Sequence, residues 1–507
     1  MYETVVVTSK ERFGSLLKKD IDVLTQTATH TMGRDVAEPS AEYAGFSFSV
    51  PFIYTGLAFG GVPEMVDCAD ALDSLRGACR QLRICVGLGT THELILQEMF
   101  SVAFLVRTSQ PKDHIAYLNN GTCNVLAKDS VALPEIRLRK EGYLGDYKIG
   151  KRIFSREPLA LATRDNDSEW TDLVNSVVQL FYTAESLNLT QSQARDALDK
   201  PPSSSWEQAN SNVLNIRMLQ LVAEFGNYLE LYERTLQAIV PREALNYLYK
   251  DDSNLNEANT SNATGLLYYY PWGNIMAVGP GPLPGHTLKE VKTRGYLVCG
   301  VLPKPGFAQY DDETKSWSGL DVDFCKALNA AIHVGSTANI EYIDVSDFSS
   351  SSTDAMAPQV KPEPNYDFLF NRSVDVIAGD RMTLEKDILA NVTFSSPYYY
   401  GNHAANSLAG YGFATRPDDS EWSDFVFWIV MATFYAEEQG IYQADPREMP
   451  TVGLFGEEMK PMLFDCIMAV GNYAEKYQRQ TLLLPRAGPN LLNVNLTGPQ
   501  QFPLPIS

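Results

Sequence analysis

Long apolar runs are missing from this 507-residue chain, and basic residues are few beside the acidic ones. A membrane helix needs about 18–20 consecutive apolar residues, and the best candidate, residues 425–436, is too short, so we expect a buried helix there. The chain carries 41 Lys and Arg against 62 Asp and Glu, a net charge of −21. Because nucleic acids and anionic membranes bind through clustered Lys and Arg, the sequence predicts neither partner and no membrane span.

Recognisable signatures of catalysis and of metal binding are missing as well. The seven cysteines show no Cys-x-x-Cys spacing, and the six histidines are scattered. Gly-x-Ser-x-Gly, Walker and His-Glu-x-x-His patterns do not occur. The sequence therefore predicts no metal site and no cofactor, and it favours a protein that is not an enzyme.

What the chain does contain is a repeat. "ATRDNDSEW" at 162–170 returns as "ATRPDDSEW" at 414–422, and each copy leads into an apolar stretch with helical spacing, residues 170–185 and 422–438. Further on, "EFGNYLELYER" is echoed by "AVGNYAEKYQR", and each is followed by a Pro-Arg pair and then Asn. The repeat has the scale of a domain rather than of a solenoid unit, which indicates a duplication.

The cysteines favour an oxidising compartment. Cys299 lies on a predicted strand and Cys325 on the following predicted helix, where their Cβ atoms can approach, and Cys85 and Cys123 are placed similarly. The predicted bridges are Cys299–Cys325 and Cys85–Cys123, with Cys68–Cys79 left open and Cys466 left over. Disulfides persist in secreted proteins.

Glycosylation sequons agree with export. Asn-X-Ser/Thr occurs at Asn120, Asn166, Asn188, Asn259, Asn262, Asn371, Asn391 and Asn495, although chance explains some of these. Residues 1–7 are strand-like and do not resemble a signal peptide. We nevertheless expect an extracellular or secretory-pathway glycoprotein.

Residues 286–331 carry a family resemblance. The stretch contains "YLVCGVLPKPGF" and "GLDVDFCKALNAA". The N-terminal half of the chain contains "CVGLGTTHELILQEMF" and "GTCNVLAKDSVAL". These segments resemble bacterial family 3 extracellular solute-binding proteins of the general L-amino-acid ABC-transporter kind. The resemblance extends over nearly the whole chain.

The resemblance implies an α/β, type II periplasmic-binding-protein fold, in which two lobes are joined by two crossing strands and close on a ligand between them. Alternating strand and helix patterns agree with this class. We predict two tandem, incomplete copies. Copy one is residues 1–283, with lobe 1 from 1–50 and 161–283 and lobe 2 from about 51–160. Copy two is residues 284–507, a lobe 1 with its C-terminal helices.

Each copy is expected to lack a part. Copy one begins at what should be the second strand of lobe 1, residues 3–8, so the natural chain extends upstream or copy two covers the exposed neighbours. In copy two the second lobe is missing, and residues 401–412 are expected to be a short Gly-rich loop that closes the gap. The insert at 349–364 is rich in Ser and Pro and is expected to be an exposed, poorly ordered loop.

The ligand site is predicted from charge pairing, because an unpaired buried charge costs several kcal/mol. The resemblance assigns Asp129 to a ligand ammonium group. Thr90 and Thr91 open a predicted helix after a strand, where backbone N–H groups favour an anion. The alternatives are that Thr90 and Asp129 merely cap helices.

The lobe 1 half of the site departs from the family pattern. Gln26 stands where the resemblance places a carboxylate-binding arginine, and Thr27 follows it. Loss of a bidentate charged pair is expected to weaken carboxylate binding by about 1.5–3 kcal/mol. In copy two Gly379 occupies this position, with Arg381 as the candidate replacement and Phe307 in a loop near the cleft.

Three functions remain open. The first is a binding protein for a small polar ligand, such as an amino acid, with a transporter or receptor partner left unknown. The second is a degenerate copy kept as a structural or interaction module. The third is a dehydratase-like enzyme.

Overall fold

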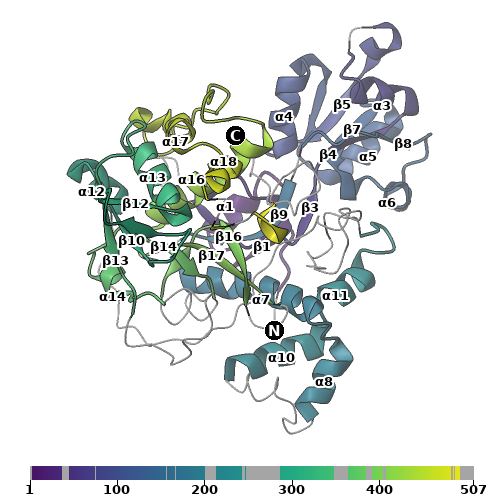
Figure 1. The fold of residues 1–507 in the computed structure, drawn as a ribbon. Helices are drawn as coiled ribbons and strands as arrows, with labels where there is room; N and C mark the ends of the chain where they lie inside the picture. Colours follow the sequence, from purple (N-terminus) through teal and green to yellow (C-terminus); the bar gives the residue numbers. More distant parts are fainter. Residues whose placement is uncertain are drawn as a thin grey trace.

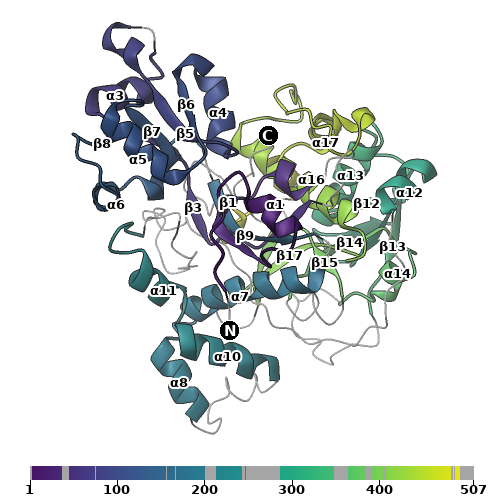
Figure 2. The same cartoon turned by 180° about the vertical axis from the view of Figure 1, so that it is seen from behind.

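The computed structural model describes residues 3–36, 45–74, 76–155, 157–165, 167–199, 213–242, 246, 286–347, 363–383, 391–403, 407–480, 483–484 and 486–491. Three α/β bodies make up the described chain. Figures 1 and 2 show residues 57–149 as a body that projects from one side, with the C-terminal half of the chain on the other. The strands β1 (Leu24–Thr29) and β9 (Glu157–Arg164) lie between them, and the helices α8 (Gln191–Asp199) and α10 (Val213–Phe225) lie below.

The central body contains the residues that the sequence assigns to lobe 1 of copy one. Its sheet has the order β1-β9-β2, and β3 also pairs with β9, all antiparallel. Its elements are α1 (Arg12–Leu17), β1 (Leu24–Thr29), α2 (Met32–Asp35), β2 (Phe46–Phe48), β3 (Ile53–Thr55), β9 (Glu157–Arg164), α7 (Ser168–Ser186), α8 (Gln191–Asp199), α10 (Val213–Phe225) and α11 (Tyr228–Thr235).

Lobe 2 is a five-stranded sheet with the order β6-β5-β7-β4-β8. The pairs β5–β6 and β5–β7 are parallel, as crossover helices require. Its elements are β4 (Leu57–Gly61), α3 (Pro63–Asp70), β5 (Ile84–Gly87), α4 (Thr91–Met99), β6 (Leu105–Thr108), α5 (Pro111–Asn120), β7 (Val125–Asp129), α6 (Glu135–Lys140) and β8 (Lys148–Ile149).

Copy two contains a sheet with the order β13-β10-β14-β17-β15, to which β16 adds by pairing with β17, and a separate hairpin of β11 and β12. Its elements are α12 (Thr287–Arg294), β10 (Leu297–Val301), β11 (Gln309–Asp311), β12 (Ser316–Ser318), α13 (Leu320–Ile332), β13 (Ile340–Asp344), α14 (Asp367–Phe370), β14 (Val376–Arg381), β15 (Thr393–Phe394), β16 (Tyr399–His403), β17 (Ser407–Thr415), α16 (Ser420–Glu438), α17 (Met462–Val470) and α18 (Tyr473–Arg479).

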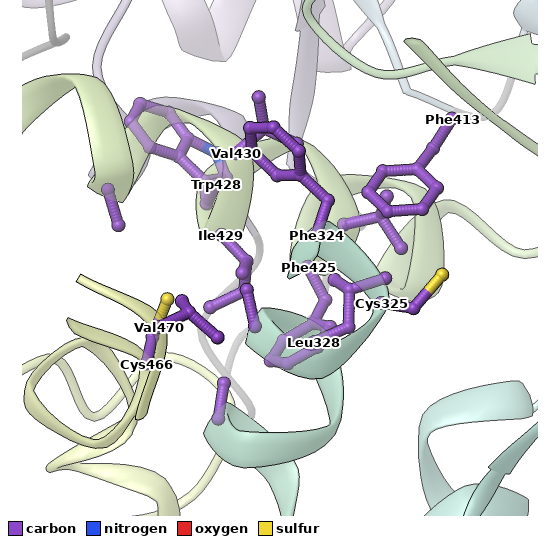
Figure 3. Close-up of a cluster of buried hydrophobic side chains, with 14 of the residues drawn as sticks. Phe324, Cys325, Leu328, Phe413, Phe425, Trp428, Ile429, Val430, Cys466 and Val470 are labelled. Atoms are coloured by element: carbon purple, nitrogen blue, oxygen red, sulfur yellow. The ribbon is translucent and has the colours of Figure 1, made fainter. Parts of the chain in front are cut away.

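The predicted apolar helix at 425–436 lies inside α16, whose side chains are mostly buried in the core of copy two. Figure 3 shows Phe425 and Ile429 of α16 close to Leu328 of α13 and Val470 of α17. None of the helices that the structure describes is long and apolar enough to cross a membrane.

The repeated nonapeptide performs the same task in both halves. In each copy it ends the returning strand, β9 or β17, and opens the long helix, α7 or α16. The indole Nε1 of Trp170 donates to the carbonyl of Asp22, just before β1, and that of Trp422 donates to the carbonyl of Asp375, just before β14. The motif therefore fastens the helix to the start of the neighbouring strand.

The repeated Pro-Arg pairs also have one geometry. Arg242 binds Glu185 of α7 at 2.9 Å, and Arg486 binds Glu437 of α16 at 2.8 Å. In each copy the following asparagine makes two hydrogen bonds with the backbone of a strand tyrosine; these pairs are Asn246 with Tyr54 and Asn490 with Tyr400. A buried polar clip therefore joins helix, loop and sheet in both halves.

The prediction of a strand at residues 3–8 is wrong. Residues 3–7 have no regular structure, and in the part of the chain that the structure describes no strand pairs with them. In copy two the equivalent strand, β13, pairs only with β10. Copy one has no described counterpart of β10, so a strand at residues 3–8 would leave its backbone groups without partners.

The predicted closing loop at 401–412 is instead mostly a β-hairpin. β16 and β17 pair from Tyr399 with Tyr411 to His403 with Ser407. In copy one the strand equivalent to β16 is β3, after which the chain leaves for lobe 2. Copy two turns back at that point, because a tight antiparallel turn satisfies the same backbone groups. Most of the insert expected at 349–364 lies outside the described residues.

Disulfides join Cys68 to Cys79, Cys85 to Cys123 and Cys299 to Cys325, while Cys466 is free and buried. The first two bridges lie within lobe 2 and the third connects β10 to α13.

A buried polar contact joins the two halves. The indole Nε1 of Trp428 on α16 donates to Asp35 Oδ2 on α2 at 2.9 Å, and both side chains are buried. The other oxygen of Asp35 lies 3.0 Å from His30 Nε2, and the His30 ring stacks on Phe48 and Phe427. Desolvated groups of both copies are thus satisfied only when the copies are together.

We predict that Trp428→Phe lowers the free energy of unfolding by about 1–3 kcal/mol, because it leaves one oxygen of the buried Asp35 carboxylate without its donor. Denaturant unfolding followed by circular dichroism measures this. Trp170→Phe is the matched control, since that indole donates near the surface to a backbone carbonyl. Equal losses for both variants would contradict the special role of Trp428.

Candidate functional site

The chain crosses between the lobes of copy one at Gly56 and again near Ser155. A Cβ atom on Gly56 would lie only 2.0 Å from the carbonyl oxygen of Ser155, so the two crossings can approach this closely only with glycine there. The Ser155 hydroxyl accepts from Leu57 N at 2.9 Å, and the Gly56 carbonyl accepts from Ser130 N at 2.8 Å. The first bond joins the two crossings, and the second joins the Gly56 crossing to the end of β7.

A fully buried carboxylate stands next to these crossings. Glu157, the first residue of β9, is 0% exposed. Its two oxygens accept hydrogen bonds from Ser155 Oγ at 2.8 Å and from Thr91 Oγ1 at 2.9 Å. Thr91 belongs to lobe 2 and also approaches Thr29 Oγ1 of β1 at 3.5 Å. The lobes therefore meet through side-chain oxygens.

Asp129 ends β7 at the same junction. One of its oxygens lies 3.6 Å from Nε2 of His92, a buried residue in the first turn of α4. Burial alone would lower the pKa of His92, but Asp129 and, more weakly, Glu157 raise it above its ordinary value. The junction therefore favours positive charge at this position.

Two arginines of lobe 1 bring positive charge. Arg12 opens α1 and is 4% exposed, and Arg34 of α2 donates to the Thr29 carbonyl at 2.7 Å. Burial lowers the pKa of Arg12 to about 10 and, together with the charge of Arg12, that of Arg34 to about 9. The negative charge of Asp129 raises both pKa values, but by less than burial lowers them. Both guanidinium groups stay protonated at neutral pH.

The predicted lobe 2 residues come together with different contacts. The Thr90 hydroxyl accepts from Glu93 N at 3.2 Å and therefore caps α4, the simpler alternative. Asp129 precedes a short 3-10 helix but makes no side-chain capping bond, and it faces His92 instead. Among the three predicted residues Thr90, Thr91 and Asp129, it is Thr91 whose side chain forms hydrogen bonds with lobe 1.

The predicted residues of lobe 1 and copy two do not join this group in the described contacts. Gln26 and Thr27 lie on β1, but their side chains are outside the described residues. Arg381 forms an ion pair with Glu363 at 3.2 Å, and Phe307 is buried against the ring of Tyr399. Both of these belong to copy two's own body.

Sequence reasoning missed four members of the junction, namely Arg12, Arg34, His92 and Glu157. The signals were present. Arg12 begins an amphipathic helix with its side chain on the apolar side, and Arg34 follows β1 in "HTMGRD". Glu157 stands where the chain returns from lobe 2, a position that topology makes central to both lobes.

Charge of both signs, hydroxyl groups and two chain crossings thus meet between two α/β lobes. This arrangement keeps opposite charges away from bulk water. The fold and the junction together define a bilobed solute-binding protein.

Comparison with known proteins agrees with this class. The chain is 30% identical over 243 residues to the general L-amino acid-binding periplasmic protein AapJ of Rhizobium johnstonii, a match that covers 45% of this chain and 67% of that protein. It is 23% identical over 248 residues to the putative amino-acid ABC transporter-binding protein YhdW of Escherichia coli, covering 46% and 69%. The chain belongs to the family of amino-acid-binding proteins of ABC transporters.

Among solved structures, a periplasmic binding protein of an ABC transporter from Brucella ovis with glutathione bound is 22% identical, with a TM-score of 0.39. The match covers 48% of this chain and 78% of that one. No family model matches the chain.

We predict that His92 and His114 give opposite pH dependences of stability. The folded-state pKa of His92 is raised, so its contribution is present below about pH 6.5 and is lost as the pH rises through the folded value. His114 is buried against Thr108, and burial lowers its pKa to about 3, so its contribution is lost as the pH falls below about 6.5.

Melting temperatures between pH 5 and pH 9 measure the difference. His92→Gln should flatten the alkaline side of the profile, and His114→Gln should flatten the acidic side. The same change of slope in both variants would contradict the assigned charge states.

Proposed function

We propose that copy one binds a free amino acid or a similar small zwitterion between its lobes. The observation that carries this is the meeting of Arg12 and Arg34 with Asp129 and Glu157 at one junction built from both lobes. A zwitterion taken out of water needs an opposite charge at each end. The arginines provide the positive pole for a carboxylate, and Asp129 provides the negative pole for an ammonium group.

The arginines would also compensate for Gln26. The resemblance places the carboxylate-binding arginine at that position on β1, and the chain has Gln instead. Arg34 lies beyond the end of the same strand and is already held on the Thr29 carbonyl. In this proposal the positive charge has moved from the strand to the following helix, while Thr91 keeps a hydroxyl group at the ligand.

The finer assignments belong to the same proposal. We propose units at 1–283 and 284–507, with one ligand site in copy one. The matched clips of Arg242 and Arg486 support a duplication. Three disulfides support an oxidising, extracytoplasmic location, and several sequon asparagines, including Asn120 and Asn371, are exposed for glycans.

A second candidate is a structural module that binds no ligand. It is favoured by the direct contacts between the lobes, because Thr91 already donates to Glu157 and Asp129 already faces His92. In that case the charges of the junction satisfy one another. Ligand binding would require these contacts to open.

The two candidates differ in a thermal-shift screen of the twenty amino acids. A ligand that binds only the folded protein raises the melting temperature. We expect at least one amino acid to do so, and Asp129→Asn to reduce its affinity by about tenfold or more, since a buried charged hydrogen bond is lost.

Asp146→Asn is the control, because Asp146 is an exposed residue of the same lobe. It should leave binding unchanged. If no amino acid shifts the melting temperature of the wild type, the structural module is the better account.

A further inference from the structure

A cavity of about 230 Å³ lies between the two copies. Equivalent surfaces of each copy form its walls: the long helices α7 and α16, and the segments that enter β3 and β16. Its residues occur in matched pairs, among them Tyr54 with Tyr400 and Asp172 with Asp424. Arg12, Arg34, Asp129 and Glu157 do not line it, so it is separate from the junction between the lobes.

One amide in this wall has no partner. Gln179 of α7 is 2% exposed, and neither its Oε1 nor its Nε2 makes a hydrogen bond among the described residues. It lines the cavity. A buried amide without partners costs free energy, so a polar ligand group that met it would remove that cost. The equivalent residue on α16 is Met431, so the feature belongs to one side only.

The charged groups that line the cavity are strongly biased toward acid. Asp35, Asp172 and Asp424 face it, with His30 beside Asp35, and no Lys or Arg is among the lining residues that the structure describes. Of the ion pairs that the structure describes, none includes Asp172 or Asp424.

The pKa values of the two matched carboxyl groups are raised above their ordinary values. Burial and, secondarily, Glu169 raise the pKa of Asp172 to about 7. Burial raises the pKa of Asp424 well above its ordinary value, and acidic neighbours add to the effect; these are Asp165, Asp35, Glu421 and Asp419. A cation placed here would favour the ionised carboxylates and lower their pKa values.

The rest of the lining combines apolar side chains with hydroxyl and amide groups. Phe48 and Phe427 lie on either face of His30, and Met382 and Met431 are further apolar members. The hydroxyl and amide groups come from Ser47, Ser49, Tyr54, Thr171, Asn175, Thr393, Ser395, Ser396, Tyr400 and Ser423. The volume corresponds to that of about eight water molecules in the liquid, which suits one compact organic molecule. Pockets of this kind combine an apolar lining with a few polar groups that fix orientation.

We propose that the cavity between the copies binds one small organic amine, with its ammonium group held by Asp172 and Asp424. The Gln179 amide accepts a further hydrogen bond from the ligand, and the apolar body of the amine packs against Phe48 and Phe427. The matched helices each supply one carboxylate, so the site exists only because two copies face each other.

Three probes of similar size test the proposal by calorimetry and thermal shift: 2-phenylethylamine, 2-phenylethanol and 3-phenylpropionate. We expect the amine to bind and to raise the melting temperature, and the alcohol and the carboxylate to bind at least about tenfold more weakly, because neither provides a charge opposite to the carboxylates. Equal binding of the alcohol would show a merely apolar cavity and would overturn the proposal, as would failure of the amine to bind.

Two variants locate the site. Asp424→Asn should weaken the amine about tenfold or more, and Gln179→Met, which copies the residue found in the other half, should raise the melting temperature without ligand and weaken the amine. Amine binding that is unchanged in both variants contradicts the proposed location. Asp196→Asn, an exposed change on α8, is the matched control and should bind the amine like the wild type.

The outcome is independent of the amino-acid site. Asp129→Asn should leave the amine affinity unchanged, and Asp424→Asn should leave amino-acid binding unchanged. Loss of amine binding in Asp129→Asn would place the amine in the lobe junction and overturn the proposal.

Discussion

The structure depends on one returning strand in each half. β9 satisfies its backbone by pairing with β1, β2 and β3, and β17 does the same with β14, β15 and β16. Because buried N–H and C=O groups must find partners, neither half has a closed sheet until this strand arrives. The long helix follows at once, and the nonapeptide fixes the joint through the indoles of Trp170 and Trp422.

The same constraint explains how one half can have a second lobe and the other none. The strand that precedes the return, β3 or β16, pairs antiparallel with it in both halves. What lies between the two strands is free to be a hairpin turn or a complete α/β body. The lobe contacts at Glu157 follow from this, since the first residue of the returning strand must stand where the chain comes back.

Sequence patterns predicted the elements whose partners are close in the chain or repeated in it. The helix opened by Ser168 and the disulfide between Cys299 and Cys325 are of this kind. Residues 3–8 have strand-forming composition, yet composition says nothing of a missing neighbour, and pairing decides strands. The approach of Arg12 to Asp129 of lobe 2 could not be predicted either, because the two residues are distant in sequence.

Contact between the two halves places equivalent side chains around one cavity. Equivalent surfaces that meet bring equivalent side chains together, so a single acid on each long helix becomes a pair of acids, Asp172 and Asp424, in one enclosed volume. Burial raises the pKa of both carboxyl groups, and other acidic side chains nearby add to the effect. The contact between Trp428 and Asp35 secures the arrangement beside this volume. The proposed amine site would therefore need both halves of the chain in contact, since each half supplies one of its acids.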